Sequence, residues 1–144
     1  MHHITRSEVV PYSASDMFSL VADVDRYKEF LPWCVGSRIL GREKSDILAV
    51  IEVGQGPVRT SFTTRARARH NARLDIQLVD GPLKALEGSW RFEDLSEGGS
   101  RVILDLRFET DGSLPLFLTE SLLKHVTGRI VSAFKKRAAS LYRP

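Results

Sequence analysis

Residues 25 to 40, DRYKEFLPWCVGSRIL, mark the point where the chain changes from helix to strand. Asp25 to Phe30 forms one helical turn, and Pro32 ends it because the residue before a proline avoids helical dihedral angles. The residues that follow predict a strand. Tyr27, Phe30 and Trp33 concentrate aromatic surface at this bend. We expect these rings either to close one end of the core or to line a cavity.

The residues before this stretch predict a strand and a first helix. Residues 4 to 10 contain four β-branched side chains and are followed by Pro11, which predicts a strand. Ser13 and Ser15 are candidate N-caps for a short amphipathic helix. The apolar residues of that helix are Met17, Phe18, Val21 and Ala22.

From residue 37 to residue 110, apolar and polar residues alternate with a period of two, which is typical of strands. Expected turns at 54–57, 70–72, 80–86 and 96–100 divide this region, so an antiparallel meander with one buried face is predicted. The side chains on its inward face are Ile47, Ala49, Ile51 and Val53; Phe62, Thr64, Ala66 and Ala68; Leu74, Ile76 and Leu78; Gly88, Trp90 and Phe92; and Val102, Leu104, Leu106 and Phe108.

The last segment returns to helical periodicity. Ser113 as a cap and Pro115 in the first turn predict one long helix that ends near Ser140. Thr119 interrupts its apolar stripe; we expect its hydroxyl to bond the helix backbone, with a ligand contact as the alternative. The stripe itself consists of Leu116, Leu122, Leu123, Val126, Ile130, Ala133 and Phe134.

These elements predict an α+β fold of the helix-grip type. A curved antiparallel sheet wraps around a long C-terminal helix, and two short helices lie near the N-terminus. Several inward positions carry small side chains, among them Ala49, Ala66, Ala68 and Gly88. Small residues either let backbone layers approach or leave an apolar void, and the sequence leaves both alternatives open.

Length and composition limit the class of protein. The 144 residues suit one domain, 1–144, with 42% hydrophobic and 27% charged residues. No apolar run approaches the roughly 20 residues that span a bilayer, and the first ten residues lack the apolar stretch of a signal peptide. We therefore expect a cytoplasmic protein, or one held peripherally on the cytoplasmic face of the inner membrane. The single cysteine, Cys34, is expected to be a buried structural thiol.

Five arginines and no acidic residue occur between residues 59 and 73. Within TRARAR, Arg65, Arg67 and Arg69 alternate with alanines, so a strand projects all three arginines to its outer side. This outer face is expected to be solvated. The alternative is a docking patch for phosphate, RNA or anionic lipid.

Three separated segments resemble the coenzyme Q-binding START-domain family, a branch of the polyketide cyclase/dehydrase and lipid transport superfamily. They are DVDRYKEFLPWC, LVDGPLKALEGSWRF and IVSAFKKRA. The resemblance covers nearly the whole chain and implies a helix-grip fold with an apolar tunnel that binds ubiquinone (coenzyme Q) without catalysis and supports respiratory electron transport. Bacterial members overlap with the ribosome association toxins, which are described as blocking ribosomal subunit joining. The resemblance therefore also implies the ribosomal large subunit as an alternative partner.

The predicted ligand site combines the inward pattern with this resemblance. Tyr27, Phe30, Leu31 and Trp33 would form one wall, and Leu83 and Leu86, on a loop longer than a tight hairpin needs, would form a lid or a membrane contact. The remaining candidates are Ala66, Ala68, Trp90, Thr119, Leu122, Val126 and Ile130.

The sequence offers almost no catalytic chemistry. The four histidines show no metal-ligand spacing, and His2 and His3 are expected on a frayed N-terminus. We expect no enzyme activity, no metal, no covalently bound cofactor and no DNA partner. The ligand would be ubiquinone or another prenyl lipid. A cyclase or hydratase with Tyr27 or Thr119 as a polar participant is the weakest alternative.

Overall fold

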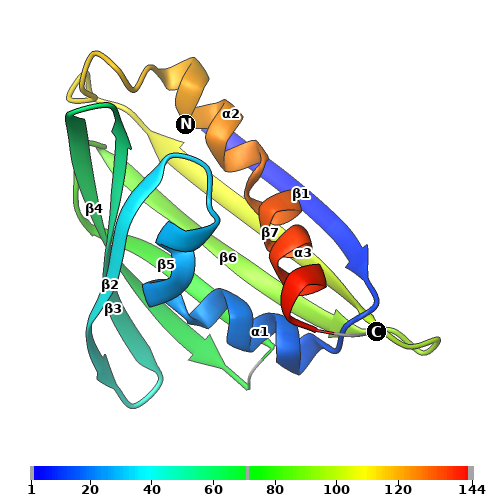
Figure 1. Ribbon diagram of the computed structural model, residues 1–144. Helices are drawn as coiled ribbons and strands as arrows, with labels where there is room; N and C mark the ends of the chain where they lie inside the picture. The colour runs from blue at the N-terminus through cyan, green and yellow to red at the C-terminus, as the bar shows by residue number, and fades with distance from the viewer. Residues whose placement is uncertain (1, 71, 143–144) are drawn as a thin grey trace.

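The computed structural model describes residues 2–70 and 72–142 and consists of one curved sheet with helices against its inner face (Figure 1). All neighbouring strands are antiparallel, in the order β1-β7-β6-β5-β4-β3-β2, which confirms the predicted meander and the α+β helix-grip class. The strands are β1 His2–Val10, β2 Cys34–Glu43, β3 Asp46–Gln55, β4 Val58–Arg69, β5 Arg73–Asp80, β6 Ala85–Asp94 and β7 Ser100–Glu109.

The first strand begins earlier than expected. β1 pairs with β7 along its whole length, with Ile4 opposite Leu106. His2 Nε2 lies 2.8 Å from Glu120 Oε1, and His3 Nε2 lies 2.5 Å from Asp105 Oδ1. The expectation of frayed histidines was therefore wrong, because strand pairing and two carboxylates hold them.

Two short helices follow β1, as predicted. The α1 helix, Ala14–Ala22, begins after Ser13, whose Oγ accepts a hydrogen bond of 3.1 Å from the Asp16 backbone N–H. The 3-10 helix η1, Val24–Glu29, ends before Pro32. The chain then turns into β2, so the change from helix to strand falls where the sequence placed it.

The predicted single C-terminal helix was wrong in two respects. It begins only after Thr119, and it is divided into α2, Glu120–Gly128, and α3, Ile130–Leu141. The division falls at Arg129, directly after Gly128. A Cβ at Gly128 would lie 3.2 Å from the Arg6 guanidinium, so this packing favours glycine, and the poor helix propensity of glycine favours a break here.

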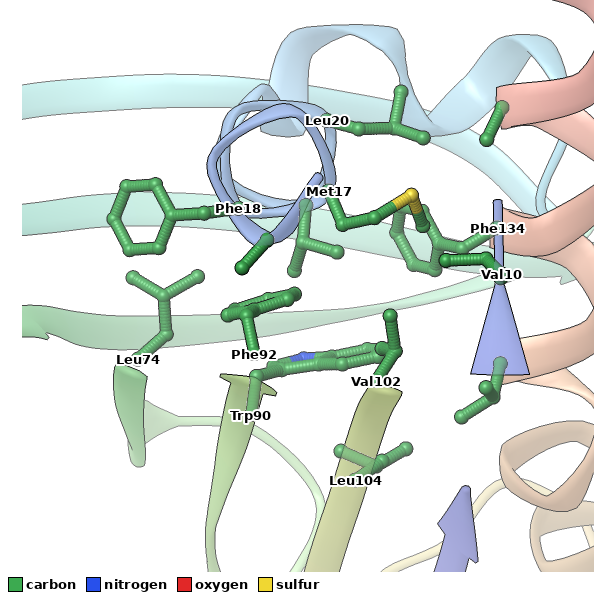
Figure 2. Close-up of a cluster of buried hydrophobic side chains, with 14 of the residues drawn as sticks. Val10, Met17, Phe18, Leu20, Leu74, Trp90, Phe92, Val102, Leu104 and Phe134 are labelled. Carbon is green, nitrogen blue, oxygen red and sulfur yellow. The ribbon is translucent and has the colours of Figure 1, made fainter. Parts of the chain in front are cut away.

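The main core lies between α1, α3 and the inner faces of β6 and β7 (Figure 2). The Trp90 and Phe92 rings stack with centroids 6.2 Å apart, and Phe134 of α3 meets Trp90 edge-on at 5.2 Å. Phe18 of α1 packs edge-on against Phe92 at 5.7 Å. These aromatic contacts join both helical segments to one end of the sheet.

A smaller apolar cluster stabilises the opposite end. It contains Leu118 and Leu123 from the segment that enters α2, and Phe108, which is fully buried. Register shifts in β2 and between Thr63 and Thr64 of β4 bend the sheet between the two clusters. The predicted turn at 70–72 includes Asn71, which lies outside the described residues.

Candidate functional site

An apolar cavity of about 190 Å³ lies between the inner face of the sheet and the helices. The strands β3 to β7 supply half of its wall. The rest comes from α1, η1, α2 and α3, from Cys34 of β2 and from the loop residues Leu31, Pro32 and Leu83. The cavity forms where small and medium side chains such as Ala66 and Thr64 face the helices, so the space is not completely filled. The sequence had left core and void open as alternatives, and the structure contains a void.

The structure brings together most of the residues predicted for the site. Ala66 of β4 faces the same cavity as Val126 and Ile130 of the helices, as its alternation with the arginines predicts. The predicted residues that line the cavity are Tyr27, Leu31, Ala66, Leu83, Leu86, Trp90, Val126 and Ile130.

Phe30 and Trp33 lie at the bend but outside the cavity lining. The Phe30 ring packs behind the wall, 5.1 Å from the Phe134 centroid. Trp33 is half-buried with φ of 64°, a backbone conformation that is rare for bulky residues, and its carbonyl accepts a hydrogen bond of 3.0 Å from the Gly54 N–H. The Phe30 ring therefore supports the wall from outside, whereas the Trp33 backbone fixes the bend.

Ala68, Thr119 and Leu122 also lie outside the cavity lining. Ala68 packs against the main core near the end of β4, and Leu122 packs against the smaller cluster. Thr119 is exposed, and its Oγ1 accepts a hydrogen bond of 3.1 Å from the Leu122 N–H. Its hydroxyl therefore caps α2, which is the structural role expected for it.

Several lining residues were not among the predicted site residues. They include Cys34, Ile51, Phe62, Thr64 and Thr127. The alternation of β3 and β4 already placed Ile51, Phe62 and Thr64 on the inward face, so a signal for them existed. Thr127 is spaced four residues after Leu123 and three before Ile130, a helical spacing that would have identified it.

The polar groups in the cavity wall bond mainly to nearby backbone. The Tyr27 hydroxyl donates to the Val21 carbonyl, and Thr127 Oγ1 donates to the Leu123 carbonyl over 2.9 Å. Cys34 Sγ lies 3.3 Å from the Gly36 carbonyl. The Thr64 hydroxyl has no hydrogen-bond partner within the described part of the chain. Its hydroxyl is therefore the polar group best placed to bond a ligand.

Burial controls the ionisation of the two acidic groups in the wall. Desolvation raises the pKa of Tyr27, and it also raises the pKa of the half-buried Cys34 thiol. The lining contains no Asp, Glu, His, Lys or Arg among the residues that the structure describes. The site therefore presents neutral hydroxyls and a neutral thiol in an apolar wall, a chemistry suited to binding.

The expected loop at 80–86 is shorter than predicted, because Leu83 lies on it but Leu86 already belongs to β6. Leu83 is buried and Leu86 is half-buried, and both side chains line the cavity, as predicted for ligand-site residues. Leu83 therefore covers the cavity, and neither leucine forms an exposed membrane contact in this conformation. Leu116, which was assigned to the apolar stripe of the helix, is instead fully exposed.

The opposite face of the sheet carries an open groove of about 540 Å³. Arg65, Arg67 and Arg69 point into this groove, as predicted for the outer side of β4. Arg67 Nε lies 3.0 Å from Asp46 Oδ1, and Arg69 Nε lies 2.7 Å from Asp75 Oδ2. The arginine groove is therefore partly neutralised, whereas Arg65 has no ion-pair partner among the described residues.

A curved antiparallel sheet closed by C-terminal helices around an apolar cavity defines a helix-grip domain of the START type. The chain belongs to the family described as polyketide cyclase / dehydrase and lipid transport, whose model matches residues 10–135. This membership confirms the family resemblance drawn from the three sequence segments. Within the described residues, no helix is long and apolar enough to cross a membrane.

Relatives of two kinds are similar to the chain. Ribosome association toxin RatA of Escherichia coli K12 is 38% identical over 99% of this chain and 90% of its own length. Coenzyme Q-binding protein COQ10 homolog B, mitochondrial, of Xenopus laevis is 32% identical over 96% of this chain, which spans 58% of that relative. The solution structure of the 18 kDa protein CC1736 from Caulobacter crescentus is 30% identical, with a TM-score of 0.73 and 98% of each chain covered.

Proposed function

We propose that the protein binds ubiquinone or a similar prenyl lipid in its apolar cavity, without catalysis, as a carrier that supports respiratory electron transport. The observation that carries this proposal is the cavity itself, with its apolar wall free of ionisable bases among the described residues. Burial of apolar surface would supply most of the affinity, and Thr64 would orient the polar end of the ligand. The similarity to a coenzyme Q-binding protein supports the same ligand class.

The cavity volume determines which part of such a ligand is enclosed. A protein cavity of about 150 Å³ accepts one benzene ring, so 190 Å³ holds a quinone ring with little of its tail. A longer prenyl tail then needs a path out of the wall. Leu31 and Pro32 are half-buried wall residues at the bend, and we place the exit beside them.

A matched pair of substitutions on β4 tests the proposal. Ala66 lines the cavity and Ala68, two residues further on the same face, does not. Phenylalanine at Ala66 can occupy the void, so Ala66→Phe should keep its melting temperature within a few degrees and lose bound quinone. Ala68 is half-buried against the main core and outside the cavity, so a phenylalanine there has no void to fill, and Ala68→Phe should lose about 1 to 3 kcal/mol of unfolding free energy and retain the ligand.

The measurements are thermal melts and mass spectrometry of lipid extracted from natively purified protein. If the wild-type protein carries no prenyl lipid and takes none up from a detergent solution of ubiquinone, the proposed ligand is wrong. If Ala66→Phe retains the quinone, the ligand does not occupy this cavity.

Ribosome association is the second candidate function. It is favoured by the arginine groove, which lies on the other face of the sheet from the cavity, and by the RatA relatives that match almost the whole chain. Guanidinium groups bind phosphate through paired hydrogen bonds, so ribosomal RNA is the part of the large subunit that this groove would contact.

A further inference from the structure

A second groove, of about 310 Å³, lies between α3 and the bend after η1. We call it the α3 groove. Its floor contains Phe30 and Pro32, and its rim contains Arg129, Ser132, Lys136 and Arg137. Arg129 directly precedes α3, and Ser132, Lys136 and Arg137 follow it by three, seven and eight residues, a helical spacing that brings them to one side of the helix.

The charges around the α3 groove are not balanced. Arg137 Nη2 lies 2.6 Å from Glu29 Oε1 and its guanidinium lies 5.1 Å from the centre of the Phe30 ring. Arg26 also pairs with Glu29, at 3.0 Å, so this carboxylate already has two cations. Arg129 and Lys136 form no ion pair with another residue in the described part of the chain. Positive charge therefore remains in excess.

Arg137 also has an unused hydrogen-bond donor, but this donor lies below the surface. Its Nε is buried and has no hydrogen-bond partner among the described residues. The groups that an anion in the groove would meet are therefore the exposed side chains of Arg129 and Lys136 and the outer part of the Arg137 guanidinium. The acceptor that fits three clustered cations is an anionic oxygen group such as a phosphate.

The α3 groove adjoins the apolar cavity. Pro32 lines both spaces, and α3 contributes Ile130 and Phe134 to the cavity while Arg129 and Ala133 border the groove. A molecule seated in the groove therefore lies next to the Leu31–Pro32 part of the cavity wall. This is the same place through which a prenyl tail would leave the cavity.

We propose that the α3 groove binds the phosphate of an anionic membrane lipid and thereby holds the Leu31–Pro32 wall of the cavity against the bilayer. The proposal rests on the proposed function, because it assigns the surface on which the cavity exchanges its lipid. Basic side chains beside an apolar floor are the combination that attaches helices to anionic bilayers. Phe30 and Pro32 would lie at the level of the headgroups, with Arg129 and Lys136 against the phosphates.

The arginine groove is less suited to a bilayer. Its lining is polar and charged apart from Ile76 and Gly88, so it lacks an apolar floor that could enter a bilayer, and Asp75, Glu87 and Asp105 offset part of its positive charge. No acidic residue lines the α3 groove among the described residues, and its nearest carboxylate, Glu29, is paired. The structure therefore assigns the membrane contact to α3.

Vesicle flotation tests this assignment. The wild-type protein is mixed with phosphatidylcholine vesicles, with or without phosphatidylglycerol, and we expect flotation only with the anionic lipid. Each basic residue near an anionic surface contributes about a fivefold change in partitioning, so Arg129→Gln with Lys136→Gln should lower binding about twentyfold or more. Arg65→Gln with Arg107→Gln removes the same charge from the arginine groove and should leave vesicle binding unchanged.

Two further measurements distinguish a lipid phosphate from free phosphate, and the α3 assignment from the proposed function. The melting temperatures in inorganic phosphate and in chloride, at equal ionic strength, should agree. If phosphate raised the melting temperature as much as anionic vesicles do, the membrane assignment would be overturned. Equal vesicle binding by both double variants, or loss of ribosome binding only in the α3 variant, would also overturn it. Lipid extraction tests the proposed function separately. If the wild-type protein carries quinone but does not bind anionic vesicles, only the α3 assignment is contradicted.

Discussion

We expect the reactivity of the Cys34 thiol to depend on whether the cavity is occupied. It is the only cysteine of the chain, its side chain is half-buried, and it lines the cavity. Burial raises its pKa, so near neutral pH it is a neutral thiol in the folded protein. Since only the thiolate reacts rapidly with alkylating reagents, this residue reports on both burial and occupancy.

We predict that Cys34 reacts with iodoacetamide more slowly in the folded protein than in the urea-unfolded protein. The difference in ionised fraction should be largest above about pH 8.5, where an unperturbed thiol is mostly ionised and the raised pKa keeps Cys34 protonated. Added ubiquinone should slow the reaction further, and this protection should be absent in Ala66→Phe. Mass spectrometry of the single site measures the rate in each condition, and equal rates for the wild-type protein with and without ubiquinone would contradict occupancy of this cavity.

The small residues of the sheet show that a sequence predicts which face a side chain occupies but not whether it borders a void. Ala66, Ala68 and Gly88 were all assigned to the inward face, and strand alternation was sufficient for that assignment. The structure gives them different roles: Ala66 borders the cavity, Ala68 packs in core, and a Cβ at Gly88 would lie 2.3 Å from the Asp105 carbonyl oxygen. Which small side chain leaves a void depends on the residues facing it across the fold, and alternation carries no information about them.

Among the elements, the segment before α2 shows why the C-terminal helix begins later than its cap residues predicted. Ser113 and Pro115 suggested a start, yet Leu118 is buried with 1% of its surface exposed while Leu116 is fully exposed. Leu118 anchors the segment in the smaller cluster, and Thr119 then caps α2. The anchor is a tertiary contact, so the local cap signals could not locate it.

This arrangement predicts different costs for two similar substitutions. Leu118→Ala removes a buried side chain from the smaller cluster and should lower the unfolding free energy by about 2 to 5 kcal/mol. Leu116→Ala removes an exposed side chain and should change it by less than about 0.5 kcal/mol. Urea denaturation of both variants measures the difference. Comparable losses would show that Leu116 is also packed.

The strands were predictable because each carries its own alternation, whereas the division of the C-terminal helix was not. That division depends on Gly128 lying over Arg6, a residue more than a hundred positions earlier. The same reasoning applies to the site. Residues that lie on a regular face, such as Val126 and Ile130, were found, and those displaced by the bend, such as Trp33, were misplaced.

At the scale of the whole molecule, one sheet separates two surfaces of opposite chemistry. Its inner face encloses the neutral cavity, and its outer face carries the arginine groove. Adjacent residues of β4 point to opposite sides, so Ala66 and Arg67 are neighbours in sequence but belong to different surfaces. The two candidate functions therefore use separate side chains and can be tested independently.

We predict that substitutions on the two faces of β4 have separable effects. Glutamine at Arg65, Arg67 and Arg69 should release the protein from ribosomal particles at low salt and leave bound quinone unchanged. Glutamine is preferable to glutamate, because an acid at Arg67 or Arg69 would face Asp46 or Asp75, whose pKa values these arginines lower. The lost ion pairs are exposed and each contribute about 0 to 1 kcal/mol, so the fold should persist.

Ala66→Phe is the matched variant on the other face, and it should sediment with ribosomes as the wild-type protein does while it loses quinone. Phosphate contacts release counterions, so wild-type ribosome binding should fall steeply between low and moderate salt, and the triple glutamine variant should show a shallower slope. Sucrose-gradient sedimentation at several salt concentrations, with lipid extraction from the same preparations, measures both properties. If Ala66→Phe lost both properties while its melting temperature stayed unchanged, quinone binding would be a requirement for ribosome association, and the two faces of β4 would not act independently.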